Sequence, residues 1–256
     1  MANQFARYPS LRNRPVFISG GATGIGASLV AHFAEQESKV AFVDIEDDAA
    51  ASLVDGIRQD GHPAPHYARC DIRDIAALQA AIAAAEKAVG SFTVLVNNAA
   101  HDERHRLEDV TPEYWEDRLA VNLRHQFFAA QAIAPMMRRA GGGSIINFGS
   151  ISWHLHQGGM PAYTTSKAGI EGLTRGLASD LGPHGIRVNC VVPGWIMTER
   201  QMKKWLTPDA EAELARTQCL PGKVMPEDVA RLVLWLAADD SRMCTAHNWI
   251  VDGGWR

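Results

Sequence analysis

Tyr163 and Lys167 are four residues apart, so a helix through this segment would place their side chains on one face, one turn apart. Ser150 stands thirteen residues before Tyr163, directly after the apolar run Ser-Ile-Ile-Asn-Phe-Gly, and Asn122 lies in a helix-length segment further upstream. A positioned phenol can exchange a proton with a reacting alcohol or carbonyl, and a hydroxyl can hold the reacting oxygen. These residue types therefore indicate acid–base chemistry at a C–O bond.

A glycine-rich segment, Gly20-Gly21-Ala22-Thr23-Gly24-Ile25-Gly26, follows the first apolar run and precedes an amphipathic stretch. A strand, a glycine turn and a helix in this order let the backbone approach a pyrophosphate at the helix N-terminus, although a plain tight turn has the same composition. Asp44 ends the second apolar run, and Ile45 and Glu46 follow it without an arginine. An acid there accepts hydrogen bonds from both ribose hydroxyls and repels a 2′-phosphate, which predicts NAD. The alternative is an exposed aspartate at a strand end.

The elements that must position these residues alternate along the chain. We expect strands at residues 16–19, 40–44, 65–71, 93–98, 144–149, 186–192 and 248–251, separated by helix-length segments. Such βαβ units predict one domain over residues 1–256, a Rossmann-type doubly wound parallel α/β sheet of about seven strands with helices on both faces. The polar, proline-containing segment 195–225 breaks the alternation and is expected to be a substrate lid.

Composition excludes several other classes. Net charge is −4 with no concentration of Lys and Arg, so we expect neither a nucleic-acid nor a membrane partner. No apolar run is long enough for a signal peptide or a membrane span. The four cysteines are scattered and form neither a disulfide framework nor a C-x-x-C pair, and a reducing cytoplasm is the expected location.

Taken together, the motifs resemble the short-chain dehydrogenase/reductase superfamily over nearly the whole chain. The matching pieces are Gly20-x-x-x-Gly24-x-Gly26, Asp71, Asn97-Asn98-Ala99, Asn122, Ser150, Tyr163-x-x-x-Lys167 and Pro193-Gly194. Two departures are mild, since Ser19 replaces a usual threonine and Ala100 a usual glycine. The resemblance implies that the nicotinamide cofactor is held by Gly20, Ala22, Thr23, Gly24, Ile25, Gly26, Asp44, Ile45, Asp71, Ile72, Asn98, Ala99, Ala100, Tyr163, Lys167, Pro193, Gly194, Ile196 and Thr198.

The resemblance also implies catalytic roles. Tyr163 would be the acid/base, Ser150 would bond the reacting oxygen, and Lys167 would lower the pKa of Tyr163 and hold the nicotinamide ribose. Asn122 would support a water that leads from Lys167 to solvent, Thr198 would bond the carboxamide, and Asp71 would bond the adenine amino group. A lone aspartate such as Asp71 is more often a helix cap, here for a helix that starts near Asp74.

The expected pKa shift is physically reasonable. Poising a phenol with a pKa of ~10 near neutrality needs roughly 4 kcal/mol of anion stabilisation. One cation ~4 Å away supplies about that much at an effective dielectric of ~20. We therefore expect Lys167 and the positive nicotinamide ring to suffice, without a metal ion.

The substrate half is similar to bacterial sugar 1-dehydrogenases of the D-xylose type. The matching pieces are His101-Asp102-Glu103-Arg104-His105, Asn122-Leu123-Arg124-His125, Asn147 through His154, Gln218-Cys219-Leu220 and Gly254-Trp255-Arg256. The resemblance implies oxidation of a cyclic aldose at C1 and a homotetramer. A sugar needs several donors and acceptors plus an aromatic face, and the expected substrate residues are His101, Asp102, Ser150, Ser152, Trp153, His154, Gln157, Tyr163 and Trp195.

Several alternatives remain open. Trp153 has an alternative place in the core, only one of His154 and His156 can face the site if their segment is extended, and Trp255-Arg256 fits a pocket or an interface. A polyol or 2-keto-3-deoxy sugar-acid dehydrogenase would aim a cation at a carboxylate, for which Arg104, Arg124 and Arg200 are candidates. A catalytically inactive dinucleotide-binding protein would be expected to lack Tyr163 or Lys167, and both are present.

Overall fold

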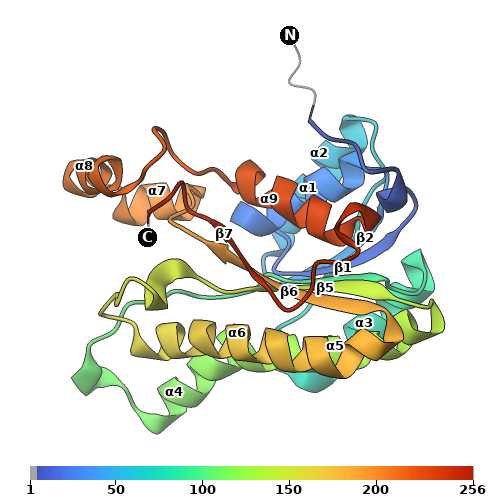
Figure 1. Cartoon of the computed structure of the whole chain (residues 1–256), viewed down its shortest axis with the longest axis horizontal. Coiled ribbons are helices and arrows are strands. Elements are labelled where there is room, and N and C mark those ends of the chain that lie inside the picture. Colours follow the sequence, from blue (N-terminus) through green and yellow to red (C-terminus); the bar gives the residue numbers. More distant parts are fainter. Residues whose placement is uncertain (1–4, 256) are drawn as a thin grey trace.

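The computed structural model describes residues 5–255 and contains one seven-stranded parallel sheet in the order β3-β2-β1-β4-β5-β6-β7 (Figure 1). Its chain order reverses between β1 and β4, which is the topological switch point where such sheets bind ligands. The strands are β1 (Pro15–Ser19), β2 (Lys39–Asp44), β3 (His66–Arg69), β4 (Val94–Asn97), β5 (Gly143–Phe148), β6 (Ile186–Pro193) and β7 (Asn248–Val251). The predicted fold class is therefore confirmed.

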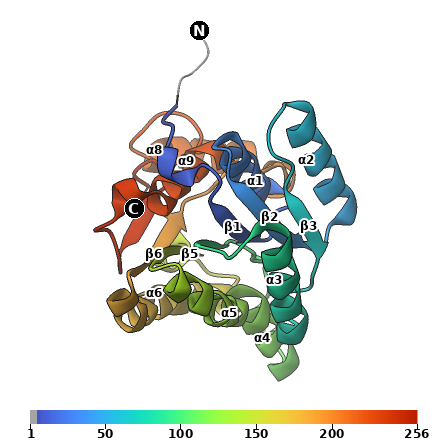
Figure 2. The ribbon, with the colours of Figure 1, turned by 90° about the vertical axis from the view of Figure 1, so that its right-hand side faces the viewer.

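Helices cover both faces of the sheet (Figure 2). One face carries α1 (Gly24–Glu35), α2 (Asp47–Gln59) and α9 (Pro226–Ala237), and the other carries α3 (Ile75–Val89), α5 (His125–Arg139) and α6 (Pro161–Leu181). In β1, Val16 and Ile18 enter the first of the two cores and Phe17 enters the second. Because both faces are buried, the strands are continuously apolar rather than alternating, as the sequence shows.

A π-helical turn, Ala120–Arg124, interrupts the segment for which the sequence indicates one long helix. It separates α4 (Pro112–Leu119) from α5 and contains the buried Asn122. Such turns often occur at functional sites, because they displace a backbone carbonyl from the regular ladder.

Segment 195–225 forms α7 (Glu199–Trp205) and α8 (Pro208–Thr217) with loops around them. Figure 1 shows both helices beyond one end of the sheet, near the C-terminus of the chain. The segment starts directly after β6, so it lies at the carboxyl ends of the strands, as expected. None of the helices within residues 5–255 combines the length and apolar character that a membrane span requires.

Candidate active site

Tyr163 and Lys167 lie one turn apart on α6, and both side chains contribute to one buried cluster. The Lys167 Nζ donates a hydrogen bond to the Phe148 carbonyl at 2.8 Å and lies 5.4 Å from the centre of the Tyr163 ring. Phe148 is the last residue of β5, so this bond fixes the helix to the carboxyl end of the central sheet. The lysine is 1% exposed, which leaves its charge poorly solvated.

Ser150 completes the group from the loop that follows β5. Its Oγ accepts a hydrogen bond from the Ser152 N–H at 3.2 Å and so caps the 3-10 turn Ile151–Trp153. The interaction of the same hydroxyl with Tyr163 acts to lower the pKa of the phenol. The structure thus brings together the three side chains that the sequence singles out.

The chain's own groups act on the pKa of Tyr163 in opposite directions, and the lowering expected from Lys167 together with a nicotinamide ring stays a prediction. Burial raises the pKa of Tyr163 to about 12, and the Asp102 carboxylate adds to the rise; Ser150, Arg104 and Arg200 oppose it without cancelling it. Burial depresses the pKa of Lys167 to about 8, and its ammonium group donates to the Phe148 carbonyl. The expectation treated the phenol as a solvated group, whereas desolvation is the largest effect here.

Asn122 holds the loop that follows β4. Its Oδ1 accepts from the His101 N–H at 2.8 Å, and its Nδ2 donates to the carbonyls of His101 and Arg118 at 3.2 and 3.0 Å. Both amide hydrogens of Asn122 are engaged, so the expected water would bond to one of its oxygens; Gln126 Nε2 donates to the backbone carbonyl at 3.5 Å.

The glycine turn has the shape that close approach to a pyrophosphate requires. Gly20 and Gly24 adopt positive φ angles of 68° and 55°. A Cβ at Gly26 would lie 1.7 Å from the Gly20 carbonyl oxygen, and Asn98 Nδ2 donates to that same oxygen at 2.7 Å. Side chains at these positions would push the loop apart. The turn therefore fits a dinucleotide phosphate at the N-terminus of α1.

Asp44 lies at the end of β2 beside that turn. Its Oδ2 accepts from the Ala22 N–H at 2.8 Å and its Oδ1 from the Ile45 N–H at 2.7 Å. Thr23, which precedes α1, and Ile25 are part of the same turn. The carboxylate is thus fixed where the ribose of a bound dinucleotide would be expected.

Asp71 lies at the end of β3, between the buried Cys70 and Ile72. Arg73 donates to its carboxylate through Nε at 3.0 Å and through a terminal nitrogen at 2.6 Å, and these bonds lower its pKa. The suggested capping role is wrong, because Asp74 caps α3 by accepting from the Ala77 N–H at 3.0 Å.

The remaining expected cofactor residues lie on the other side of the switch point. Ala99 and Ala100 follow β4, and the Ala99 N–H donates to the Ser19 Oγ at 3.3 Å. Thr198 caps α7, and a Cβ built on Gly24 would lie 3.0 Å from its Cγ2, so Thr198 is next to the glycine turn. The residues before it are Pro193, Gly194 and the buried Ile196.

Two of the expected substrate residues, Asp102 and Trp195, meet in one hydrogen-bond network. Asp102 accepts from Arg200 and, at 2.8 Å, from Gln201 Nε2. Gln201 Oε1 in turn accepts from Trp195 Nε1 at 2.9 Å. His101 lies beside this network and contacts Arg118 at 2.7 Å through Nδ1. The network connects the loop after β4 to α7.

Trp153 and His154, two of the expected substrate residues, each turn one ring nitrogen toward α6, and their contact with a substrate stays a prediction. Their rings stack 3.7 Å apart, and the indole Nε1 and the imidazole Nε2 both lie 2.9 Å from Glu171 Oε1. The segment is a 3-10 turn rather than extended, and this turn directs both side chains to α6. Ser152 is buried, whereas Gln157 is exposed and lines a separate shallow hollow with Thr164 and Thr165.

Trp255 lies within the described chain and Arg256 lies outside it. The Trp255 ring is 6.3 Å from that of Trp195 and packs against the cluster that contains Ile151 and Val192. Trp255 therefore packs against the cluster that contains Ile151, the residue after Ser150.

Sequence reasoning missed Glu171, Gln201 and the role of His125. His125 is fully buried, and its Nε2 lies 3.1 Å from the Ala99 carbonyl; burial and the charge of Lys167 lower its pKa to about 3, so it is neutral. One signal existed for Gln201, because Thr198-x-x-Gln201 has the spacing of a capping box. Nothing in the sequence identified Glu171 or His125.

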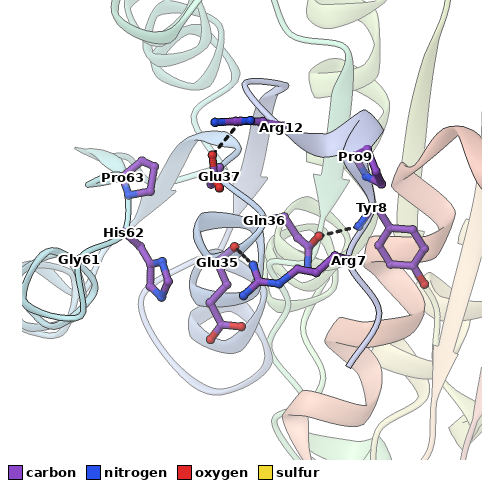
Figure 3. A pocket seen from close by; sticks show the side chains of 10 residues that line it. All are labelled: Arg7, Tyr8, Pro9, Arg12, Glu35, Gln36, Glu37, Gly61, His62 and Pro63. Atoms are coloured by element: carbon purple, nitrogen blue, oxygen red, sulfur yellow. Dashed lines mark hydrogen bonds and ion pairs between the residues drawn. The ribbon is translucent and has the colours of Figure 1, made fainter. Parts of the chain in front are cut away.

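A separate hollow lies at the opposite end of the sheet (Figure 3). It is lined by Arg7, Tyr8, Pro9, Arg12, Glu35, Gln36, Glu37, Gly61, His62 and Pro63. Arg12, Glu37 and Gly61 precede β1, β2 and β3, so the hollow is at the amino ends of the strands, remote from Tyr163.

We expect Glu171→Ala to destabilise the protein by about 2 kcal/mol, because three half-buried polar groups would lose their hydrogen-bond partner. These groups are on Trp153, His154 and Asn248. Thermal unfolding monitored by circular dichroism measures the effect. The exposed Glu108→Ala is the control and should change stability by at most about 0.5 kcal/mol. Equal stability of the two variants would contradict the structural role of Glu171.

Comparisons with known proteins agree with this geometry. A family model described as enoyl-(acyl carrier protein) reductase matches residues 20–256. The chain is 51% identical to D-xylose 1-dehydrogenase from Caulobacter vibrioides (strain NA1000 / CB15N), covering 98% of this chain and 99% of that protein. It is 48% identical to "Probable galactose dehydrogenase GalD" from Rhizobium meliloti (strain 1021), covering 97% of each.

A solved structure extends the agreement to three dimensions. The 7 alpha-hydroxysteroid dehydrogenase complexed with NADH and 7-oxo glycochenodeoxycholic acid has a TM-score of 0.91 and 30% identity, covering 96% of each chain. Together with the glycine turn, this likeness indicates a nicotinamide dinucleotide as cofactor. Since both the family model and the relatives extend along nearly all of it, the chain belongs to the short-chain dehydrogenase/reductase family and is an oxidoreductase.

Proposed function

We propose that this protein oxidises a cyclic aldose at C1 to the aldonolactone, with NAD as the hydride acceptor. The observation that carries the proposal is the polar network of Asp102, Gln201 and Trp195 beside Tyr163. Such donors and acceptors, with an indole nearby, suit a polyhydroxylated ring and not a steroid or an acyl chain. The D-xylose and galactose dehydrogenase relatives support the same substrate class.

The proposed reaction breaks the C–H bond at C1 and the O–H bond of the anomeric hydroxyl. Tyr163 takes the proton of the anomeric hydroxyl, while Ser150 holds the oxygen by a hydrogen bond. The carbon–hydrogen electron pair leaves C1 as hydride, and a C1=O bond forms. The bound dinucleotide supplies the hydride acceptor and a positive charge close to the phenol. The Lys167 ammonium group, 5.4 Å from the centre of the Tyr163 ring, contributes a second positive charge.

Cofactor choice rests on Asp44. We expect Asp44→Ala to reduce the ratio of kcat/KM for NAD over NADP by about tenfold or more, because the variant loses both the ribose acceptor and the repulsion of a 2′-phosphate. Initial rates with each dinucleotide measure the ratio. The exposed Asp48→Ala on α2 is the matched control and should keep the wild-type ratio. An unchanged ratio in Asp44→Ala would mean that the ribose is held elsewhere.

The sugar-acid alternative is weaker in this structure. It requires a cation that is free to meet a carboxylate. Arg200 is paired with Asp102, and Arg124 donates to the Arg73 carbonyl at 2.8 Å. Arg104 lies over the Trp205 ring and 2.9 Å from the Met160 sulfur. Activity with linear polyols, compared with activity with aldoses, distinguishes a polyol substrate from an aldose.

Incubation of the protein with NAD and a panel of pentoses, hexoses and linear polyols tests the function. The proposal predicts reduced nicotinamide, seen by absorbance, with at least one aldose, together with formation of its lactone. Turnover of linear polyols alone would contradict it.

The same proposal includes a lid, an assembly and a location. Segment 195–225 covers the substrate through α7, and the chain forms a cytoplasmic homotetramer, as the family resemblance implies. The half-buried Trp249 of the edge strand β7 offers a surface for association. Light scattering coupled to size-exclusion chromatography measures the mass, and a monomer at micromolar concentration would contradict the assembly.

A further inference from the structure

Asp102 is a largely buried carboxylate that two residues of α7 hold in place. Its side chain is 18% exposed, and its two oxygens accept from Arg200 and Gln201 respectively. Burial disfavours its ionisation, but these hydrogen bonds outweigh burial and keep its pKa below the usual range. The loop after β4 therefore presents a fixed negative charge.

That charge lies next to the reacting centre. The loop after β4 packs against the residues that precede Tyr163, because Arg104 lies 2.9 Å from the Met160 sulfur and the His105 N–H donates to the Gly159 carbonyl at 2.7 Å. The groups that act on the pKa of the Tyr163 phenol include Asp102, Ser150, Arg104 and Arg200. Asp102 is the one acid among them within the part of the chain described here, and its carboxylate also acts on the charge of Lys167. A substrate bound at Tyr163 must lie close to Asp102.

The Arg200 guanidinium forms an ion pair with the Asp102 carboxylate. Arg200 and Asp102 are ninety-eight residues apart in the chain and form an ion pair in which Arg200 is 39% exposed. An anionic substrate would have to displace Asp102 from Arg200 and would also meet the Asp102 charge. A neutral substrate meets neither cost. A carboxylate accepts about four hydrogen bonds, so Asp102 retains capacity for sugar hydroxyls.

We propose that the Asp102–Arg200 pair sets the charge selectivity of the site, admitting neutral sugars and rejecting sugars that carry a carboxylate. Asp102 accepts hydrogen bonds from the hydroxyls of a neutral aldose, and its charge repels a uronate. This inference rests on the proposed aldose oxidation and deepens it. It makes Asp102 a specificity residue, whereas Arg200 acts through Asp102 as a positioning residue.

The test compares matched sugars that differ in one carboxylate: D-galactose with D-galacturonate, and D-glucose with D-glucuronate. Asp102→Asn keeps the shape but removes the charge and frees Arg200. We expect kcat/KM for the neutral sugar to fall at least tenfold and the ratio of neutral sugar to uronate to fall about a hundredfold. The exposed Asp48→Asn on α2 is the isosteric control and should keep the wild-type ratio.

Arg200→Gln tests the pair from the other side. It leaves Asp102 charged and without its cation, so discrimination against the uronate should increase. Because this variant moves selectivity opposite to Asp102→Asn, a non-specific folding defect cannot imitate both results. The double variant, which has neither charge, should lose the uronate activity that Asp102→Asn gains.

A pH profile supplies a second readout. Asp102 raises the pKa of Tyr163, so Asp102→Asn should move the rise of kcat/KM for aldose oxidation to lower pH. A purely structural role would leave the position of this rise unchanged. If the wild type oxidises aldoses while both variants keep its selectivity and pH profile within about twofold, the inference is overturned and the proposed function stands. If the wild type oxidises no aldose, the proposed function itself fails.

Discussion

Tyr163→Phe is expected to lower kcat by roughly a thousandfold while the affinity for the dinucleotide stays within about twofold of the wild type. The substitution removes one oxygen from a half-buried ring and leaves Ser150 and Lys167 in place. General acid–base catalysis by a positioned side chain contributes about 10²–10⁴-fold, and here the phenol is the group placed to exchange the proton. Stopped-flow hydride transfer and calorimetric titration with NAD measure the two quantities.

Tyr114→Phe is the matched control for this change. The half-buried Tyr114 of α4 has its hydroxyl 3.0 Å from His105 Nδ1, outside the group formed by Ser150, Tyr163 and Lys167. Its removal should leave kcat near the wild-type value. A Tyr163→Phe enzyme that kept a tenth of the wild-type kcat would remove Tyr163 from its proposed role.

Gly26→Ala should abolish detectable dinucleotide binding. The added methyl group would lie 1.7 Å from the Gly20 carbonyl oxygen and 2.9 Å from Asn98 Nδ2, so the turn must open. An open turn can no longer present its backbone N–H groups to a pyrophosphate. Because the clash is with backbone rather than with a flexible side chain, relaxation is costly, and stability should fall as well.

Gly56→Ala provides the control on α2, where a Cβ meets nothing within 4 Å. It should leave dinucleotide affinity unchanged and raise stability by about 0.5–1 kcal/mol, since alanine is the better helix residue. Titration calorimetry and thermal unfolding distinguish the two variants. Affinity of Gly26→Ala within threefold of the wild type would show that the turn does not hold the phosphates.

The sheet could be predicted from the sequence because each strand carries its own local signal. Val94–Asn97 is a short, wholly buried apolar run, and the glycine turn fixes where the first helix begins. The Tyr163–Lys167 spacing likewise needs only a helix to place both residues on one face. Local sequence is sufficient wherever one element alone determines the position.

The surroundings of the phenol could not be predicted in this way. The Asp102–Arg200 pair joins residues that meet only after the chain folds. Trp153 and His154 contact Glu171 because of a 3-10 turn that the sequence does not predict. The pKa of Tyr163 depends on burial, which is a property of the packed core. Hydrogen-bond partners and desolvation belong to tertiary structure, so the sequence alone does not provide them.

An aldose deuterated at C1 tests the central claim most directly. If hydride passes from C1 to the dinucleotide, the reduced nicotinamide must carry deuterium at C4, and the product must be the unlabelled lactone. Mass spectrometry and NMR of both products give the answer in one reaction. Deuterium retained in the sugar product, with unlabelled reduced nicotinamide, would contradict oxidation at C1.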